Sequence, residues 1–322
     1  MKKFLKKIII GLLVFIAVNA IIMGVYEYPS YKAIQNKTHR NYLKWDAIHS
    51  PSNSFDMIII GTSRCYAAFN PVVFDSILDT NSYNMSTSAQ DIAETYYALE
   101  EIYQHQKPKY IVLDLFFETA DESYDYYQIF SNSSFFKSNK RKFSLISDGY
   151  GSSGFLNYAI PLVRFKNYIK QDVSKLFSRK ESLRVEDNWI KGHLHDTLIV
   201  SDSEISAFGP ISNFENTSFS KERFDKYFNK INALVKKNNA KLICLRAPYP
   251  PTRLSLKDTD DEGTYFKEYT SKAQIPFFDI NAKENYDEFY EDKDFADYHH
   301  TNYKGARKAS LEAAKFIKQI IY

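Results

Sequence analysis

Two short segments, far apart in the 322-residue sequence, carry residue types that could perform nucleophilic chemistry together. The first is a Gly-Thr-Ser-Arg tetrapeptide whose serine is Ser63, and the second is a polar segment that contains Asp297 and His300. A serine hydroxyl becomes a nucleophile when a base removes its proton, and a histidine base needs an acidic partner that fixes its tautomer. Asp297 lies three residues before His300, within one turn of chain. The sequence therefore predicts a catalytic triad of Ser63, His300 and Asp297.

Each segment also has a simpler interpretation. Ser63 could merely cap a helix, since serine is common at that position. The neighbouring His299 competes with His300 for the role of base. The segment around the two histidines could also be an ordinary polar surface loop, or the histidines could hold a stray metal ion. The spacing from Asp297 favours His300 as the base.

The elements that must position these residues follow from the hydrophobic pattern. Short runs rich in apolar residues, bounded by polar residues, Gly or Pro, are typical of buried parallel strands. Such runs predict strands at residues 55–60, 81–85, 110–115, 241–245 and 276–280. Apolar residues with helical periodicity predict helices at residues 91–106, 220–235, 263–273 and 303–321.

The alternation of strands and helices sets the expected fold class. It implies an α/β fold with a flavodoxin-like, doubly wound parallel sheet of about five strands. In such sheets, ligands bind beyond the carboxyl ends of the strands. Ser63 follows the first predicted strand, and the segment with Asp297 and His300 lies between the fifth strand and the last helix. The predicted fold therefore brings these residues to one edge of the sheet.

The N-terminus predicts the compartment. Four lysines within the first seven residues precede the apolar run 8–25, whose one polar member is Asn19. A helix of this length spans about 27 Å, close to the hydrocarbon thickness of a bilayer. We expect a single-pass anchor in the cytoplasmic membrane over residues 1–28, with an extracytoplasmic C-terminal body. The alternative is a cleaved signal peptide, because residues 17–20 resemble a cleavage site, but the apolar run continues past them to Val25.

The remaining chain divides into three parts by composition. Residues 29–54 are largely polar and include prolines, so they are expected to form a stalk. Residues 55–322 then form one catalytic domain. Within it, residues 120–215 interrupt the alternation of strands and helices and are rich in Ser, Asn, Asp and Tyr. We expect this part to be an insertion, part lid and part helical.

The composition also limits the classes of function. A net charge of +3 is small for this length, so a nucleic-acid partner is not expected. Tyr and Phe number 25 each, which predicts aromatic core packing or, for some of them, a groove for a carbohydrate or acyl group. Cys65 and Cys244 are expected to be buried free thiols, with a disulfide between them as the alternative. No motif predicts a metal or another cofactor, so none is expected.

Three motifs together resemble the SGNH (GDSL-like) hydrolase and acyltransferase superfamily. The G-T-S tripeptide that ends at Ser63 is similar to the G-D-S block of that family, with Thr in place of Asp. The D-x-x-H-x-N-x-x-G-A sequence from Asp297 to Ala306 matches the family's ending motif. With the F-N-P tripeptide at 69–71, the resemblance is to a membrane-anchored branch near the O-acetylation proteins of bacterial cell-surface polysaccharides. It covers roughly residues 55–120 and 219–322.

The oxyanion of the transition state needs hydrogen-bond donors, and the sequence offers few. The backbone N–H of Ser63 would be free at the start of a helix and could donate to an oxyanion. The resemblance implies a second backbone donor after the second strand, for which Ser86 is the candidate, although the usual glycine is absent. It also implies an Asn in a G-x-N block after the third strand, where this chain has Phe-Phe-Glu-Thr at 116–119.

The resemblance implies serine-dependent acyl transfer or ester hydrolysis on a cell-envelope glycan, through an acyl-Ser63 intermediate. Water or a sugar hydroxyl would accept the acyl group, and the sequence does not separate an esterase from an O-acyltransferase. By analogy, a multi-spanning membrane protein is an expected partner that supplies the acyl group. The alternative is a non-catalytic envelope binding or assembly protein on a degenerate form of the same fold.

Overall fold

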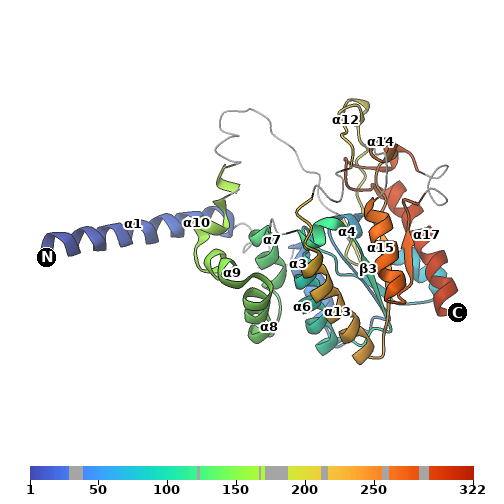
Figure 1. Ribbon diagram of the computed structural model, residues 1–322, viewed down its shortest axis with the longest axis horizontal. Helices are drawn as coiled ribbons and strands as arrows, with labels where there is room; N and C mark the ends of the chain where they lie inside the picture. Colours follow the sequence, from blue (N-terminus) through green and yellow to red (C-terminus); the bar gives the residue numbers. More distant parts are fainter. Residues whose placement is uncertain are drawn as a thin grey trace. The chain divides into compact units, whose positions relative to one another are not determined.

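The computed structural model describes residues 1–28, 39–121, 124–166, 168–170, 188–211, 217–255, 261–282 and 290–322. The chain forms two compact units. Unit 1 comprises residues 1–43 and 126–185, and unit 2 comprises residues 44–125 and 186–322. Unit 2 contains the sheet and the candidate site (Figure 1).

Unit 2 is built on a five-stranded sheet in which every neighbouring pair is parallel. The strand order β2-β1-β3-β6-β7 is the flavodoxin-like order, so the predicted fold class is confirmed. All five strands fall within the predicted apolar runs or extend them by one residue. They are β1 (Met57–Ile60), β2 (Ser82–Asn84), β3 (Tyr110–Asp114), β6 (Lys241–Arg246) and β7 (Phe277–Asp279).

The register places the carboxyl ends of the central strands together. Ile60 of β1 pairs with Leu113 of β3, and the next residue of β3, Asp114, pairs with Leu245 of β6. All four residues of β1 are buried, which explains why this strand is a continuous apolar run rather than an alternating one. The loops that follow these strands therefore emerge at one edge, where the candidate site lies.

Helices cover the sheet in two groups. The long C-terminal helix packs on α4 and α5, and α6 packs on α13. The four predicted helices are confirmed with small shifts of their ends, as α6 (Ile92–His105), α13 (Lys221–Lys237), α15 (Asp261–Lys272) and α17 (Tyr303–Ile321). The structure adds shorter elements that the sequence pattern did not predict: α4 (Ser63–Ala68), α5 (Pro71–Leu78), η1 (Phe117–Ala120), β4 (Trp189–Ile190), β5 (His193–Leu194), α12 (Asp202–Ile205), α14 (Pro251–Ser255) and η4 (Asp292–Asp294).

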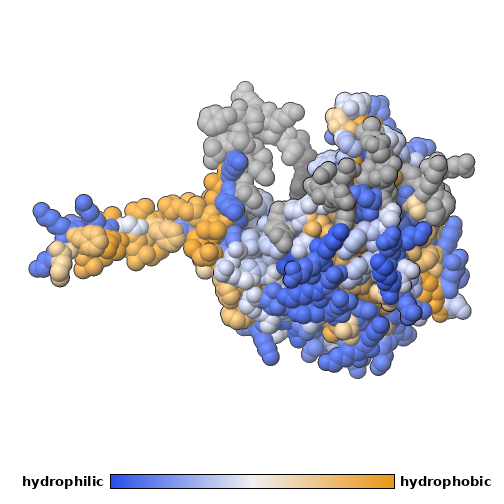
Figure 2. All heavy atoms as spheres, in the orientation of Figure 1, coloured by the Kyte–Doolittle hydropathy of each residue, from blue (hydrophilic) through white to orange (hydrophobic). Residues whose placement is uncertain are grey.

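Unit 1 contains a long apolar helix and a small helical cluster. The helix α1 spans Lys2–Tyr26 and is long and apolar enough to cross a membrane (Figure 2). The backbone N–H of Leu162 donates to the side-chain oxygen of Asn19 at 2.9 Å, which satisfies the one polar residue of the apolar run. The cluster consists of α7 (Tyr126–Ser133), α8 (Asn139–Ser144), η2 (Leu145–Gly149), α9 (Tyr150–Ala159) and α10 (Pro161–Arg164).

The structure describes only parts of the expected stalk and of the expected insertion, so their bounds stay predictions. Residues 40–49 form a helix, α3 (Arg40–His49), whose Trp45 and Ile48 are buried, whereas residues 29–38 lie outside the described residues. Half of the ten residues of α3 are polar, and one of its large apolar residues, Leu43, is exposed, so its pattern is too weak to be recognised. The expected insertion 120–215 is divided between the units, and residues 171–187 and 212–216 within it are not described.

The two cysteines are buried free thiols, as expected from the sequence. Cys65 and Cys244 are both buried and free, so the alternative of a disulfide between them is wrong. Burial raises the pKa of both thiols, so both stay protonated and unreactive at neutral pH.

Candidate active site

Ser63 is positioned by a tight connection between β1 and α4. Thr62 is the N-cap of α4, and Ser63 is its first helical residue. Gly61 is required here, because a Cβ atom at this position would lie 2.8 Å from the Cβ of Asp114 on the neighbouring strand. The N–H groups of a helix's first turn have no acceptor within the helix, so the Ser63 N–H can bind an oxyanion.

The loop that carries Asp297 and His300 is held by Asn302. This buried side chain caps α17 by accepting the backbone N–H groups of Lys304 and Gly305, at 2.9 and 3.3 Å. Its amide group donates back to the carbonyl oxygens of Lys293 and Phe295, at 2.7 and 3.2 Å. Asn302 therefore fixes both ends of the loop that contains the Asp-x-x-His segment.

Gly305 explains the next position of the same motif. A Cβ atom there would lie 2.2 Å from the carbonyl oxygen of Asp294, so only glycine permits this approach of α17 to the loop. The D-x-x-H-x-N-x-x-G spacing is thus a mechanical requirement for holding the histidine in place.

The three predicted residues form a continuous chain of hydrogen bonds. His300 Nε2 lies 2.8 Å from Ser63 Oγ. On the other side of the ring, His300 Nδ1 lies 2.9 Å from Asp297 Oδ2 and 3.1 Å from Asp297 Oδ1. These are ordinary hydrogen-bond lengths, and the serine and the carboxylate occupy different ring nitrogens. The structure therefore brings together all three members of the predicted triad.

The environment of Asp297 keeps this carboxylate ionised. Burial would raise its pKa, but hydrogen bonds from the His300 ring and from the backbone N–H groups of His299 and His300 lower it to about 2. An ionised Asp297 draws the proton of the neutral imidazole to Nδ1. Nε2 is then the acceptor for the Ser63 hydroxyl, as a general base requires.

His299 has a different environment from His300. Its Nδ1 lies 3.3 Å from Nη1 of Arg253, which also donates to the Tyr298 carbonyl at 2.8 Å. Burial, with the charges of Arg64 and Arg253, lowers the pKa of His299 to about 3, so this histidine is neutral. The structure thus pairs Ser63 with His300 and pairs His299 with Arg253.

The geometry argues against Ser86 as an oxyanion donor. Its backbone N–H donates to Asn84 Oδ1 at 3.0 Å, and its carbonyl accepts a hydrogen bond from Lys44 Nζ. Ser86 is fully buried, so its N–H would have to leave this bond before it could serve an oxyanion.

The sequence did not predict a structural role for Arg64 at the site. Its guanidinium is buried and donates to the carbonyl oxygens of Ala247 and Pro248, at 2.7 and 3.1 Å. It also lies 3.6 Å from the ring centroid of Tyr249. Arg64 therefore ties the residue after Ser63 to the loop that follows β6. A single arginine beside a serine is too common to have signalled this role.

Two features around the triad could accommodate a substrate. A cavity of about 420 Å³ lies on the Asp297 side, and its lining includes Phe208, Arg253 and Tyr298. On the other side, the Tyr66 ring lies parallel to His300 with 6.5 Å between centroids and contacts the Trp189 ring at 5.2 Å.

Comparisons with known proteins give limited similarity. No protein-family profile and no curated protein sequence matches this chain. Among solved structures, a proposed acylhydrolase of Bacteroides fragilis is similar with a TM-score of 0.38 and 11% identity, over 82% of this chain and 87% of that one. An acetyl xylan esterase of the rumen bacterium Butyrivibrio proteoclasticus is similar with a TM-score of 0.33 and 11% identity, over 84% of this chain and 64% of that one.

The chain's own topology defines its fold class as α/β. The sheet order is flavodoxin-like, a serine directly follows the first strand, and an Asp-x-x-His segment precedes the last helix. This is the arrangement that the resemblance of the sequence motifs implies.

Proposed function

We propose that this chain is a serine-dependent enzyme that transfers or hydrolyses an acyl group through an acyl-Ser63 intermediate. The observation that carries the proposal is the hydrogen-bonded chain from Ser63 Oγ through His300 to Asp297, with distances of 2.8 and 2.9 Å. Its members come from two loops that are far apart in the sequence, and each loop is held by separate contacts.

The acylation step follows from the proton positions. His300 Nε2 takes the hydroxyl proton as Ser63 Oγ forms a bond to the acyl carbonyl carbon. The resulting oxyanion is stabilised by the Ser63 backbone N–H. The carbonyl re-forms as the bond to the leaving alcohol breaks, and His300 returns its proton to that alcohol. Asp297 remains ionised throughout and stabilises the imidazolium.

The second step decides between an esterase and an O-acyltransferase. His300 removes a proton from water or from a sugar hydroxyl, and the oxygen of that acceptor attacks the acyl-Ser63 carbonyl. The bond between the acyl carbon and Ser63 Oγ then breaks, and His300 returns the proton to Ser63 Oγ. A sugar hydroxyl wins only where water is excluded from the site. The half-buried Trp189 ring, which contacts the Tyr66 ring next to His300, supports a sugar-sized acceptor, because aromatic faces pack well against sugar rings.

We further propose that the enzyme acts on a glycan of the cell envelope. Support comes from α1, whose first turns carry lysines and whose remainder is almost entirely apolar, as in a single-pass anchor with an extracytoplasmic body. A multi-spanning membrane protein that supplies the acyl group is part of this proposal. Such a protein would also offer a source for the oxyanion donor that Ser86 does not provide.

The proposal is tested by acylation with 4-nitrophenyl acetate. Intact-protein mass spectrometry should detect one acetyl adduct on the full-length chain, and peptide mapping should place it on Ser63. Ser63→Ala should remove the adduct. Ser76→Ala is the matched control, because Ser76 is exposed on α5 and its hydroxyl contacts only the Val73 carbonyl. A folded wild-type chain that never acylates, with or without its membrane fraction, would favour the binding or assembly protein instead.

A further inference from the structure

A second cluster of histidines and a carboxylate lies in unit 2, away from the triad. His49 is the last residue of α3, and Glu101 and His105 lie one turn apart near the end of α6. Since α6 connects β2 to β3 in a parallel sheet, its last turn returns to the amino ends of the strands. The cluster is therefore at the edge opposite to Ser63.

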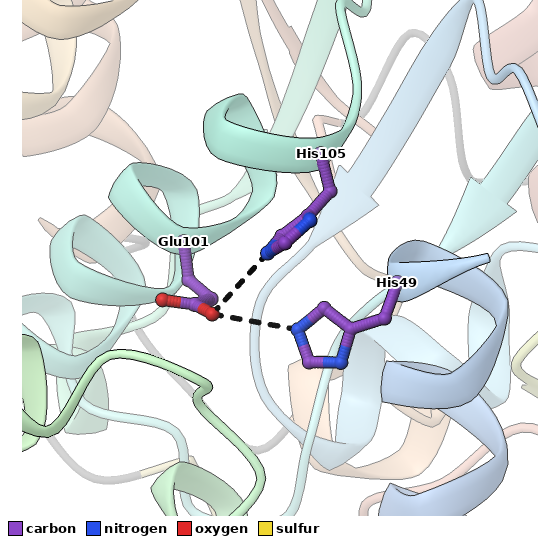
Figure 3. A group of neighbouring side chains, drawn as sticks. All are labelled: His49, Glu101 and His105. Carbon is purple, nitrogen blue, oxygen red and sulfur yellow. Dashed lines mark ion pairs between the residues drawn. The ribbon is translucent and has the colours of Figure 1, made fainter. Parts of the chain in front are cut away.

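The three side chains converge on one point (Figure 3). Nε2 of His49 lies 3.4 Å from Glu101 Oε1, and Nε2 of His105 lies 3.5 Å from the same oxygen. The ligand atoms all lie within 4.8 Å of one another. We propose that His49, Glu101 and His105 bind a divalent transition-metal ion, with Zn²⁺ as the physiological ion.

The distances fit metal ligands better than hydrogen-bonded partners. A charge-assisted N–H···O bond is about 2.7–2.9 Å long, which is shorter than both contacts here. Two ligand atoms at about 2.0–2.1 Å from a tetrahedral Zn²⁺ are separated by about 3.3 Å. The observed 3.4 and 3.5 Å are close to that separation.

One ligand atom of the cluster is buried without a hydrogen bond. His49 Nε2 is buried and makes no hydrogen bond within the described part of the chain, although Glu101 Oε1 is its neighbour. The Glu101 side chain is only 1% exposed, so its oxygen faces the two imidazole nitrogens inside the protein. A metal ion between the three groups would coordinate the buried His49 nitrogen.

The ligands are held in place by their surroundings. Glu101 and His105 share one face of α6 because they are four residues apart. The side chain of Gln106 donates to the Ile48 carbonyl at 2.8 Å, which fixes α3 next to His49. The Trp45 ring packs on the His49 ring with 5.5 Å between centroids. This preorganisation lowers the cost of assembling a metal site.

The donor set selects the class of metal. Two imidazole nitrogens and one carboxylate oxygen suit Zn²⁺ and its neighbours, whereas Mg²⁺ and Ca²⁺ prefer oxygen ligands. The His105 side chain is 25% exposed, so a water molecule can reach the fourth position. The ion would link α3 to α6 and would therefore be a structural metal ion that stabilises the packing of these two helices. The inference does not depend on the proposed function.

The first test is metal binding by the full chain in detergent, purified without a polyhistidine tag. Titration with Zn²⁺ against a chromophoric chelator should show one site with a dissociation constant in the micromolar range or tighter. Glu101→Gln, which keeps the size of the side chain, should weaken binding at least tenfold. His195→Gln is the matched control, because it removes a histidine of unit 2 outside the cluster and should bind as the wild type does.

A second test reports the location of the ion. Trp45 and Trp189 are the two tryptophans of the sequence, so Trp189→Phe leaves Trp45 as the sole indole fluorophore. Co²⁺ should quench this fluorescence, and a chelator should restore it, because His49 packs against Trp45. If Glu101→Gln proves unfolded by circular dichroism, His105→Gln at the exposed end of the cluster replaces it, with the same expected loss.

Three results would overturn the proposal. The first is a wild-type chain that binds no Zn²⁺. The second is equal Zn²⁺ affinity in the wild type and in the folded Glu101→Gln or His105→Gln variant. The third is Co²⁺ binding without quenching of Trp45. A site occupied equally well by Mg²⁺ would contradict the assigned class of metal.

Discussion

The two edges of one sheet carry two histidine–carboxylate clusters with different geometry. At the carboxyl edge, His300 lies 2.9 Å from Asp297, and the serine is 2.8 Å from the other ring nitrogen. At the amino edge, two histidines lie 3.4 and 3.5 Å from one oxygen of Glu101. The Asp297 side chain is 45% exposed, whereas that of Glu101 is 1% exposed.

The difference shows how histidines and carboxylates can be arranged either for proton transfer or for metal binding. Asp297 receives two backbone N–H groups besides the imidazole, so it stays ionised and orients one histidine toward a nucleophile. Glu101 faces two imidazoles at distances too long for good hydrogen bonds, which leaves space for an ion. A proton passes between two atoms that are in direct hydrogen-bond contact, whereas a metal ion needs ligand atoms that are farther apart from one another.

The largest expected effect comes from the base. His300→Ala should lower the rate of acylation by 4-nitrophenyl acetate by about a thousandfold or more, because triad members act as a unit. His299→Ala should change the rate by only a few-fold, because His299 contacts Arg253 and not the serine. Equal losses in the two variants, measured by stopped-flow release of nitrophenol, would reassign the base.

Replacing the acid should have the next largest effect. Asp297→Asn should lower the same rate by about a hundredfold or more, but less than His300→Ala does. The imidazole stays in place in this variant, but its tautomer and orientation are no longer fixed. An unchanged rate would mean that Asp297 only shapes the loop.

Removing metal from the wild-type chain should separate the two clusters. A Zn²⁺ chelator should lower the midpoint of thermal unfolding by several degrees, because the ion stabilises only the folded state. The rate of acylation well below that midpoint should stay within about twofold. Loss of acylation in parallel with loss of zinc would mean that acylation at Ser63 depends on the His49, Glu101 and His105 cluster, and it would contradict separate roles for the two clusters.

The smallest effect is a pH dependence of stability. The pKa of Asp297 is about 2 in the folded chain, below its ordinary value of 3.8. Ionised Asp297 therefore stabilises the folded state above about pH 4, and this contribution is lost as the pH falls toward 2. The unfolding midpoints of the wild type and Asp297→Asn should differ most above about pH 4 and converge toward pH 2. A constant difference would contradict the sign of this shift.

Much of unit 2 could be predicted from the sequence. Strands buried on both faces, such as β1, are continuous apolar runs and are recognised directly. The long helices have a clear apolar face, and the Asp-x-x-His segment has a spacing with a mechanical reason. The helix α3 could not be predicted, because its apolar residues do not mark a single buried face: Trp45 and Ile48 are buried, whereas Leu43 is exposed.

Two other parts of the sites could not be predicted from the sequence, one for a local and one for a long-range reason. The bond from the Ser86 N–H to Asn84 depends on the local path of the chain after β2, which the sequence does not reveal. Likewise, Glu101 and His105 show a common helical spacing, but His49 comes from another element. Only packing of α3 on α6 brings it within reach.

The central claim is that nucleophilic chemistry belongs to Ser63 at the carboxyl edge and not to the histidines at the amino edge. The most direct test is labelling of the full-length chain with a fluorophosphonate probe, with and without a Zn²⁺ chelator, followed by peptide mapping. We expect one adduct, on Ser63, to the same extent under both conditions. The folded His300→Ala variant should not form this adduct. An adduct on another residue, or labelling of Ser63 that requires Zn²⁺, would contradict the central claim.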